Sequence, residues 1–338
     1  MGYSGFGRLS PSFLAQFFSK TFYLQILRPC QLWHYQSVVA FAASKYHSRA
    51  WLGIFHTLAG FFFIPIFGHT LCLRAESPLS QESAKPDWRK SLRNFALRSI
   101  LFKLTDRFLY IGFQNRLFFK HFGAKEENLI FTPYSVDNNR FQSEAQKLLP
   151  AKKKLRVELG LPVDSFLVLF SGKFIAKKRP FDLLQALAKI QNPKVIALFV
   201  GDGGLRQDME DFIRKNNLEH QAVIAGFVNQ SVIPHYYAAA DAFIMCSEKG
   251  ETWGLSTNEA MNFSLPVILS DQVGCADDLV EAGKNGFTYP CGNVSALAEK
   301  IERLATMHEV ERSRMGETSL KKISEYSFSA IIAGLQKI

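Results

Sequence analysis

The chain has 338 residues, of which 47% are hydrophobic and 21% are charged. This length favours two domains, and the apolar content is sufficient for buried cores and excludes a largely disordered chain. The formal net charge is +10. The five cysteines lie far apart, at Cys30, Cys72, Cys246, Cys275 and Cys291. Because no two of them form a CxxC pair, a disulfide scaffold or a zinc ribbon is not expected, and a reducing compartment is favoured.

The excess positive charge lies in the first part of the chain. Residues 1–150 contain 18 Lys and Arg against 8 Asp and Glu, a net charge of +10, whereas the remaining 22 basic and 22 acidic residues cancel. The same 150 residues hold 20 of the 31 phenylalanines. A basic, Phe-rich surface suits an anionic membrane face or a phosphate-bearing ligand. A Phe-filled core solvated by Lys and Arg explains the same composition.

The N-terminal sequence MGYSGFGRLS lacks the basic start, the clean apolar run and the cleavage site of a secretory signal. Further along, Trp51–Leu73 has 23 residues without Asp, Glu, Lys or Arg, which is long enough to span a bilayer. Its two histidines, Pro65 and Gly68 argue against a spanning helix. We therefore favour a buried helix near 51–63, a turn, and a strand at Thr70–Arg74.

The other elements of the first half show a weaker pattern. Strands are expected at Gln31–His34, Arg107–Gly112 and Leu129–Thr132, and helices at Ser37–Ala50, Trp88–Lys103 and Asn115–Phe122. The polar, turn-rich stretch Pro133–Pro150 is predicted to be a linker. The sequence AKKKLR that follows it is predicted to open a new helix.

The second half alternates strands and helices with short turns between them. Strands are expected at Phe166–Ser171, Lys194–Val200, Ala222–Ala225, Asp241–Cys246, Pro266–Ser270 and Gly286–Pro290. Helices are expected at Pro180–Ile190, Leu205–Asn216, Ser231–Ala240, Leu255–Phe263 and Val294–Met307. Near-continuous apolar runs are typical of strands that are covered on both faces. The alternation predicts an α/β fold with a parallel, right-handed, doubly wound sheet.

Two glutamates bracket the sequence ETWGLSTNE, with Glu251 in the loop after the fourth of these strands and Glu259 inside the next helix. In a continuous helix they would lie roughly 12 Å apart, which is the order of a sugar nucleotide's length. Ionised carboxylates only accept hydrogen bonds, so the pair suits a hydroxyl-rich ligand. The helix start near Gly254–Leu255 offers backbone N–H groups to a diphosphate. Two solvated glutamates would explain the bare spacing, but the carboxyl end of a parallel strand favours a ligand site.

Cations follow the first strand of the second half, in the sequence GKFIAKKR that begins at Gly172. Lys173 and Lys178 lie where they can neutralise a diphosphate and its developing negative charge. The alternative is an ordinary solvated charge run.

A glycine-rich turn, GDGG, follows the next strand and does not spell the dinucleotide-binding pattern GxGxxG. We interpret its Gly201 and Gly203 as parts of a tight turn that lets the backbone approach a nucleotide base.

The stretch from Val223 to Pro290 contains GFVNQSVIPHYYAAADAFIMCSE, then ETWGLSTNEAMNFSLPVILSD, then VGCADDLV and GKNGFTYP. These segments resemble the donor domain of group 1 glycosyltransferases of the GT-B fold. The resemblance is specific over about residues 165–292 and extends more weakly through Leu109–Phe141. It implies two Rossmann-like doubly wound domains: an acceptor-side domain over 1–145, a nucleotide-sugar-binding domain over 146–325, and a C-terminal helix over 326–338 that returns toward the first domain.

By this resemblance, Glu251 contacts hydroxyls of the donor sugar and Glu259 contacts the ribose. The backbone at Trp253–Leu255 lies by the phosphates, and Lys173 and Lys178 bind the diphosphate. Lys173 departs from the family pattern, which more often has arginine, so the charge is kept but the bidentate fork is lost.

Two further departures from the family pattern are Cys246, where proline is usual, and Ser264, where glycine is usual. We expect both to affect packing and stability more than chemistry.

The resemblance also implies a reaction. A glycosyl group would pass from a UDP- or GDP-sugar to a glycan or lipid-linked acceptor of a cell-surface polysaccharide, with retention of the anomeric configuration and without a metal or other cofactor. The chain contains no Asp-x-Asp sequence. We expect a cytoplasmic protein with peripheral contact to an anionic membrane. We expect no nucleic-acid partner, because the positive charge is not interleaved with a reading motif.

A complete first domain of this family would begin with a strand and a glycine-rich turn. Here Gly2, Gly5 and Gly7 follow Met1 directly, so we expect the first domain to lack about one strand unit. His34 is the histidine predicted to act in catalysis from this half, and a structural or surface histidine is the alternative. Two other functions stay open: an inactive or truncated homologue that binds nucleotide sugar, and a sugar-nucleotide epimerase.

Overall fold

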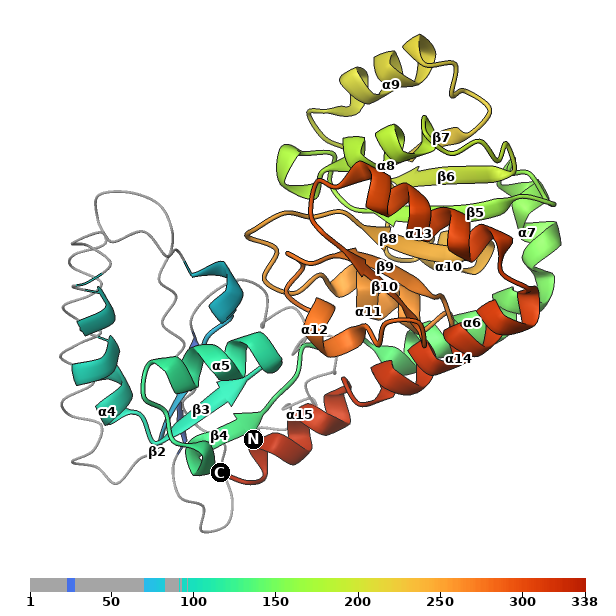
Figure 1. Ribbon diagram of the computed structural model, residues 1–338. Coiled ribbons are helices and arrows are strands. Elements are labelled where there is room, and N and C mark those ends of the chain that lie inside the picture. The colour runs from blue at the N-terminus through green and yellow to red at the C-terminus, as the bar shows by residue number, and fades with distance from the viewer. Residues whose placement is uncertain (1–22, 28–69, 83–90, 92, 96) are drawn as a thin grey trace, which may run out of the picture. The chain divides into compact units, whose positions relative to one another are not determined.

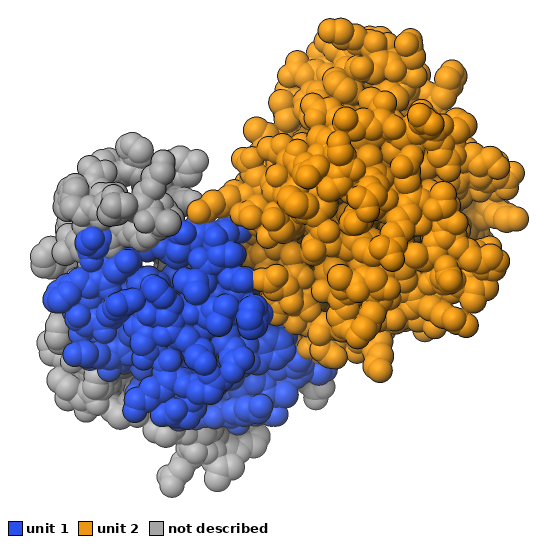
Figure 2. All heavy atoms as spheres, in the orientation of Figure 1, with its two compact units in different colours: residues 1–134, 328–338 blue, residues 135–327 orange. Residues whose placement is uncertain are grey.

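The structure, a computed structural model, describes residues 23–27, 70–82, 91, 93–95 and 97–338 (Figure 1). The chain forms two compact units (Figure 2). Unit 1 consists of Met1–Tyr134 and Phe328–Ile338, and unit 2 consists of Ser135–Ser327. The chain therefore passes between the units twice.

Unit 1 contains a four-stranded sheet with the order β1-β2-β3-β4. The strands are β1 (Tyr23–Leu27), β2 (Thr70–Arg74), β3 (Arg107–Tyr110) and β4 (Leu129–Phe131). β2, β3 and β4 are parallel and confirm the strands predicted there, whereas β1 pairs antiparallel with β2. β1 was not predicted, because its sequence YLQIL has a single polar residue and no alternation of apolar and polar positions.

The two faces of this sheet carry different cores. One face packs against α5 (Phe113–His121) through a cluster that includes Leu71, Leu73, Phe108, Phe118 and Phe119. The other face packs against the C-terminal helix α15 (Phe328–Leu335), where Leu335 and Ile338 meet Cys72, Leu109 and Ile130. Alternate residues of β2 thus point to opposite faces, as the pleat of a strand requires.

The other helical segments of unit 1 are short. Among the described residues they include the 3-10 turns η2 (Leu79–Gln81) and η4 (Glu126–Asn128), the π-helical turn η3 (Leu97–Leu101) and α4 (Phe102–Leu104), and residues 91 and 93–95 are also helical. In the part of the chain that the structure describes, no helix combines the length and hydropathy needed to cross a bilayer. The elements predicted at Gln31–His34, Ser37–Ala50 and 51–63 lie outside the described residues.

Unit 2 contains a six-stranded, wholly parallel sheet, as the sequence predicted. The strands are β5 (Phe166–Ser171), β6 (Val195–Val200), β7 (Ala222–Gly226), β8 (Ala242–Met245), β9 (Val267–Ser270) and β10 (Gly286–Tyr289). Their order is β10-β9-β8-β5-β6-β7. The chain runs outward from β5 to β7, returns to the other side of β5, and continues through β8 to β10. The strand order therefore reverses between β5 and β8.

Helices cover both faces of this sheet (Figure 1). One layer is formed by α8 (Pro180–Leu187), α9 (Arg206–Lys215) and α13 (Val294–Thr306), which share a core with Phe166, Val168 and Phe170 of β5. The other helices are α6 (Asn138–Leu148), α7 (Lys152–Glu158), α10 (Ile233–Ala239), α11 (Leu255–Met261), α12 (Ala276–Leu279) and α14 (Glu309–Ser324), with the 3-10 turns η5 (Leu149–Ala151) and η6 (Ala176–Lys178). Because helices cover both faces of the sheet, β5 is apolar at every position but its last.

The predicted linker at Pro133–Pro150 is wrong. Most of it is α6, which begins after Asp137, whose carboxylate accepts a hydrogen bond from the Arg140 N–H at 3.0 Å. The helix buries Asn138, Phe141 and Ala145, which recur at the spacing of one helical face. Its exposed face is polar throughout, and this polar majority concealed the narrow apolar stripe. α7 confirms the helix predicted to open at AKKKLR.

Ser264 stands at a backbone position that explains the usual glycine. It follows the end of α11 with φ of 54°, in the left-handed region that is unfavourable for a side chain. Serine at this position therefore affects backbone conformation, whereas an effect on side-chain packing was expected.

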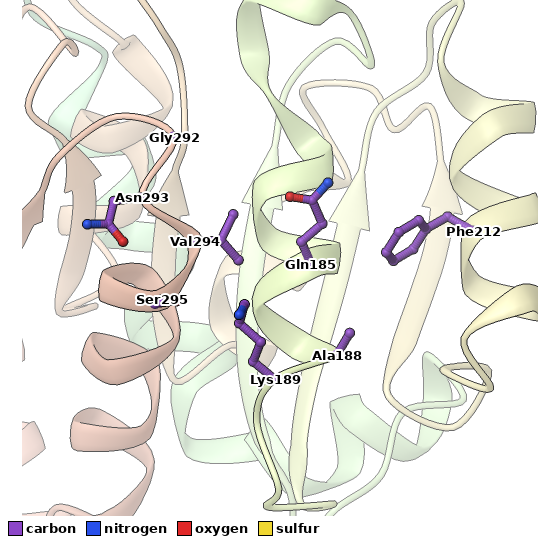
Figure 3. A pocket seen from close by; sticks show the side chains of 8 residues that line it. All are labelled: Gln185, Ala188, Lys189, Phe212, Gly292, Asn293, Val294 and Ser295. Carbon is purple, nitrogen blue, oxygen red and sulfur yellow. The ribbon is translucent and has the colours of Figure 1, made fainter.

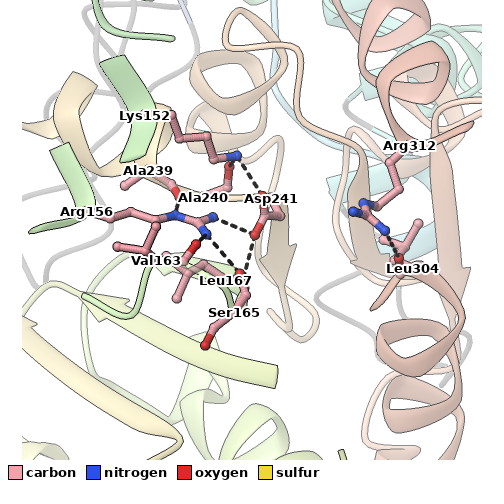
Figure 4. Close-up of polar contacts among 10 residues, drawn as sticks. All are labelled: Lys152, Arg156, Val163, Ser165, Leu167, Ala239, Ala240, Asp241, Leu304 and Arg312. Atoms are coloured by element: carbon pink, nitrogen blue, oxygen red, sulfur yellow. Dashed lines mark hydrogen bonds and ion pairs between the residues drawn. The ribbon is translucent and has the colours of Figure 1, made fainter. Parts of the chain in front are cut away.

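A buried ionic cluster lies at the amino ends of β5 and β8 (Figure 4). Asp241 accepts from Lys152 Nζ at 2.7 Å and from Arg156 Nη2 at 2.6 Å, and it also accepts from the Leu167 N–H at 2.7 Å. Arg156 donates to the carbonyls of Ala239, Val163 and Ser165. The cluster joins α7 to the strands from the end of the sheet opposite to the carboxyl-end loops.

Candidate active site

Two loops meet where the strand order of unit 2 reverses. One follows β5 and spans residues 172–179, and the other follows β8 and spans residues 246–254. A backbone hydrogen bond joins them, because the Glu248 N–H donates to the Lys177 carbonyl at 2.9 Å. The carboxyl ends of parallel strands at such a reversal are where doubly wound folds bind ligands.

Lys178 and Glu251 form an ion pair between these loops. The Lys178 Nζ lies 2.5 Å from the Glu251 Oε2, and the two side chains are 21% and 13% exposed. The pair is thus shielded yet still open to solvent, and a hydrogen bond between charged groups is stronger than one between neutral groups. Gly172 lies beside the Lys178 side chain, where an added Cβ would be 3.9 Å from its Cδ. The sequence predicted all three residues as site residues, and the structure brings them together.

The loop that carries Glu251 is fixed from its other side. The Gly274 N–H donates to the Glu251 carbonyl at 3.0 Å, and the Cys275 N–H donates to the Trp253 carbonyl at 3.1 Å. Both donors come from the segment between β9 and α12. Neighbouring carboxyl-end loops therefore hold the Glu251 backbone in a defined place.

Gly201 and Gly203 press the loop after β6 onto the loop after β5. A Cβ at position 201 would lie 1.9 Å from the Gly172 carbonyl oxygen, and a Cβ at 203 would lie 2.4 Å from the Phe174 carbonyl oxygen. The Phe174 N–H donates to the Asp202 carbonyl at 2.9 Å. This close backbone approach accounts for both glycines and confirms a tight packing turn. Their contact with a nucleotide base stays a prediction.

The segment predicted to lie by the phosphates divides into a buried side chain and a helix start. Trp253 is 3% exposed, and its Nε1 donates to the Asn258 Oδ1 at 2.9 Å while its ring lies 5.7 Å from that of Tyr326. Gly254, at φ of 107°, is the N-cap residue of α11, and Leu255 is its first residue. Within the described residues, no side chain caps this helix end. The Trp253 side chain therefore belongs to the core, and the contact of the backbone after it with phosphates stays a prediction.

Glu259 lies in α11 with a partly buried carboxylate. The Tyr237 hydroxyl of α10 donates to its Oε2 at 2.7 Å, and Tyr237 itself is fully buried. Burial raises the pKa of Glu259, and the hydrogen bond from Tyr237 opposes this effect without cancelling it. Tyr237 was not among the predicted site residues, although the tandem tyrosines at 236 and 237 were an available signal.

We expect Glu259→Gln to raise the melting temperature at neutral pH, because the amide keeps an acceptor for Tyr237 and has no charge to bury. The raised pKa means that, as pH rises, the unfolded chain releases this proton before the folded chain does. The wild type therefore loses stability between the unfolded-state and folded-state pKa values, and the variant does not.

Thermal unfolding from about pH 4 to about pH 8, a range that starts near the carboxyl's ordinary pKa, measures this difference. The stability gain of the variant should grow with pH. Glu219→Gln, at an exposed position, serves as the matched control and should show no such trend. A variant that is less stable than the wild type at neutral pH would contradict the expectation.

Two predicted residues are not joined to this arrangement. Lys173 is exposed at the start of the loop after β5 and forms no ion pair with any residue that the structure describes. His34 lies outside the described residues.

A separate pocket of about 650 Å³ opens on the helical layer (Figure 3). The pocket is lined by Gln185 of α8, by Ala188 and Lys189 just after that helix, by Phe212 of α9 and by residues 292–295 at the start of α13. None of the predicted site residues belongs to it, so the candidate active site is the meeting point of the two loops.

The fold and this site agree with what comparison with known proteins finds. The sequence model of the family described as glycosyl transferases group 1 matches residues 151–322, just over half of the chain. The matched region includes both loops and both glutamates.

Two curated relatives come from Bacillus subtilis. The chain is 31% identical to spore coat protein SA over 193 residues, and this alignment covers 54% of this chain and 49% of that protein. The chain is also 30% identical to the putative teichuronic acid biosynthesis glycosyltransferase TuaC over 172 residues, and this alignment covers 51% of this chain and 40% of that protein. The matches thus span half of these relatives' length or less.

A solved structure extends the likeness beyond the family match. The crystal structure of Anabaena HepE in complex with UDP has a TM-score of 0.67 with this chain at 22% identity, over 83% of this chain and 74% of that one. This likeness confirms the predicted GT-B fold with Rossmann-like α/β domains. With the family model matched across the candidate site, the chain belongs to the group 1 glycosyltransferases.

Proposed function

We propose that this chain is a retaining, metal-independent glycosyltransferase that moves a sugar from a UDP- or GDP-sugar to a glycan or lipid-linked acceptor in cell-surface polysaccharide biosynthesis. The observation that carries the proposal is the Lys178–Glu251 pair at the reversal of strand order. It places one cation and one acceptor group side by side, which is what a phosphate joined to a sugar requires.

Lys178 is the proposed binding group for the donor's diphosphate. An ammonium group has three N–H donors, and one of them serves Glu251. The other two can reach phosphate oxygens while the pair stays intact. Lys173, exposed on the same loop, adds a second cation. Negative charge that develops on the leaving nucleoside diphosphate is then stabilised by the protein's own cations, and this supports a reaction without a metal ion.

The two glutamates are the proposed groups for the rest of the donor. Lys178 binds the Glu251 carboxylate, and the Gly274 N–H holds the Glu251 backbone through its carbonyl; the carboxylate so placed is proposed to accept hydrogen bonds from sugar hydroxyls. Glu259 is oriented by Tyr237 and is proposed to accept from the ribose hydroxyls. The uncapped start of α11 lies between them in sequence and offers N–H groups to the phosphates. Retention of configuration rests on the family resemblance.

The acceptor side of the proposal rests on charge and on the relatives' names. Residues 1–150 carry the net charge of +10, which suits a lipid-linked acceptor presented at an anionic membrane face in the cytoplasm. TuaC is named for teichuronic acid biosynthesis, and HepE was solved with UDP.

Titration calorimetry with UDP, GDP and ADP in the presence of EDTA tests the proposal. We expect UDP or GDP to bind without added metal. Failure of all three to bind at about 1 mM, a concentration at which a weak ligand still registers, would contradict the proposal. With the matching sugar nucleotide, proton NMR should then show a product anomer of the same configuration as the donor.

Two other outcomes of the same experiments identify the alternatives. Binding without transfer to any acceptor indicates an inactive homologue. Isomerised donor in the absence of acceptor indicates an epimerase.

A further inference from the structure

Arg179 adopts a backbone conformation that is unfavourable for its residue type. It follows Lys178 directly, precedes α8, and has φ of 48° and ψ of 49°. A residue with a side chain costs about 1 kcal/mol in this left-handed region relative to glycine. Within the described residues, Arg179, Asn217 and Ser264 are the non-glycine residues with positive φ. The side chain of Arg179 therefore has to supply something that glycine lacks.

The Arg179 guanidinium makes a two-pronged contact with a buried carboxylate. Its Nε lies 2.8 Å from one oxygen of Asp182 and its Nη2 lies 2.9 Å from the other. Asp182 is only 4% exposed, whereas the Arg179 side chain is 31% exposed. A planar fork that binds a carboxylate through two hydrogen bonds fixes direction as well as distance.

The third nitrogen of the fork reaches the other loop of the candidate site. The Arg179 Nη1 lies 3.4 Å from the Glu248 Oε2, and the Glu248 N–H donates to the Lys177 carbonyl. Glu248 accepts in turn from the Glu251 N–H at 3.3 Å, through its own carbonyl. Lys178 directly precedes Arg179 in one loop, and Glu251 follows Glu248 in the other. The contact between Arg179 and Glu248 is therefore next in sequence to the Lys178–Glu251 pair.

From this geometry we propose that Arg179 is a positioning residue, which aligns the loop after β5 with the loop after β8 so that Lys178 and Glu251 meet. The two hydrogen bonds to Asp182 fix the orientation of the guanidinium, and the contact with Glu248 connects the guanidinium to the loop after β8. The Arg179 guanidinium is hydrogen-bonded to Asp182 and Glu248, so in this proposal it acts on the reaction through Lys178 and Glu251. The inference rests on the proposed function, since it assigns the alignment to donor binding and transfer.

The test uses the double variant Arg179→Gly/Asp182→Asn. Glycine suits the left-handed backbone, and removing both partners leaves no unpaired buried carboxylate, so the fold should persist. The matched control is Arg214→Ala/Asp211→Asn, an exposed pair on α9 with the same change in charge. We expect the first variant to lower kcat by about 10–100-fold, the scale of a misplacement of about 1 Å, and the control to leave it unchanged.

A double-mutant cycle separates positioning from a general loss of structure. In a Lys178→Ala background, the same Arg179→Gly/Asp182→Asn change should lower kcat by less than about twofold, because its target is already gone. An equal loss in both backgrounds, or no loss in either, would overturn the proposal.

A structural readout keeps this test independent of the proposed function. In a crystal structure of the double variant, the Lys178 Nζ and the Glu251 Oε2 should be separated beyond ion-pair distance. If they stay paired, the proposal fails even where the wild type transfers sugar. If the wild type transfers no sugar, the proposed function fails, and this distance still decides the role of Arg179.

Discussion

Replacing Lys178 with alanine should lower kcat for glycosyl transfer by about 10²–10³-fold, the effect of removing one preorganised group that stabilises transition-state charge. In our account, Lys178 is the cation nearest to the bond that breaks, and its position is fixed by Glu251 at 2.5 Å. Steady-state release of the nucleoside diphosphate from the donor measures the loss. KM should rise less than kcat falls, because the charge on the leaving group grows toward the transition state.

Two controls separate this effect from a change in the fold. Lys215→Ala removes an equal charge from an exposed position on α9 and should leave kcat unchanged. Lys178→Ala/Glu251→Ala removes both partners, so no buried charge is left alone. Its melting temperature should lie near that of the wild type, and transfer should stay lost. A Lys178→Ala enzyme with wild-type kcat would refute the assigned role.

Replacing Asp241 with asparagine should destabilise unit 2 by about 3 kcal/mol, at the lower end of the range for breaking a buried ion pair. The carboxylate serves Lys152, Arg156 and the Leu167 N–H together (Figure 4). The Asp241 side chain is 18% exposed, that of Lys152 is 30% exposed and that of Arg156 is 5% exposed, so solvent can replace the lost partner for Lys152 but hardly for Arg156. The shift in the urea midpoint of the unit 2 transition, at an unchanged slope, measures the cost.

An exposed ion pair on α7, the helix that carries Lys152 and Arg156, provides the control. Glu158→Gln breaks the pair between Lys154 and Glu158, whose side chains are 80% and 58% exposed, and it should cost no more than about 0.5 kcal/mol. Equal shifts in the urea midpoint for the two variants would show that the Asp241 cluster contributes no more to stability than an exposed ion pair does.

The Asp241 prediction also has a pH signature. Burial raises the pKa of Asp241, but its ion pairs with Lys152 and Arg156 outweigh burial and hold the pKa below its usual value. Its contribution is therefore present above the unfolded-state pKa and is lost as the pH falls through the folded-state pKa. The difference between Asp241→Asn and the wild type should narrow on acidification.

The sheet of unit 2 was predictable because its strands are short apolar runs that end at glycine or polar residues. β5, β7 and β10 begin where the sequence placed them, and β6, β8 and β9 begin one residue later. The helices α6 and α14 were not predicted, for a different reason in each case. In α6 the apolar stripe is narrow, and in α14 the central Gly316 interrupts a pattern that is mostly charged. Both derive their stability from tertiary packing, which local sequence patterns do not report.

The candidate site was predictable in its members and not in its pairing. Loops at the carboxyl ends of parallel strands identified Lys178 and Glu251 separately, 73 residues apart. Their contact depends on β5 and β8 being neighbours, which follows from strand order and cannot be obtained from the strand positions alone. The sequence alternative for the loop after β5 was a solvated charge run. Arg179 departs from that alternative because its partner Asp182, in the first turn of α8, is buried.

The two ends of the unit 2 sheet thus serve different purposes. At the amino ends, the Asp241 cluster joins α7 to the strands and supports stability. At the carboxyl ends, the loops after β5 and β8 bring together the charged groups proposed to hold a sugar nucleotide. Substitutions at Asp241 should therefore change unfolding with little effect on the chemistry of folded protein, whereas substitutions at Lys178 should do the reverse.

The most direct test of the central claim is a crystal structure of this chain with the nucleotide that calorimetry shows to bind. Our account predicts diphosphate oxygens within about 3 Å of the Lys178 Nζ, the length of a charge-assisted hydrogen bond, and a ribose beside Glu259. Nucleotide density that lies away from Lys178, Glu251 and Glu259 would contradict it.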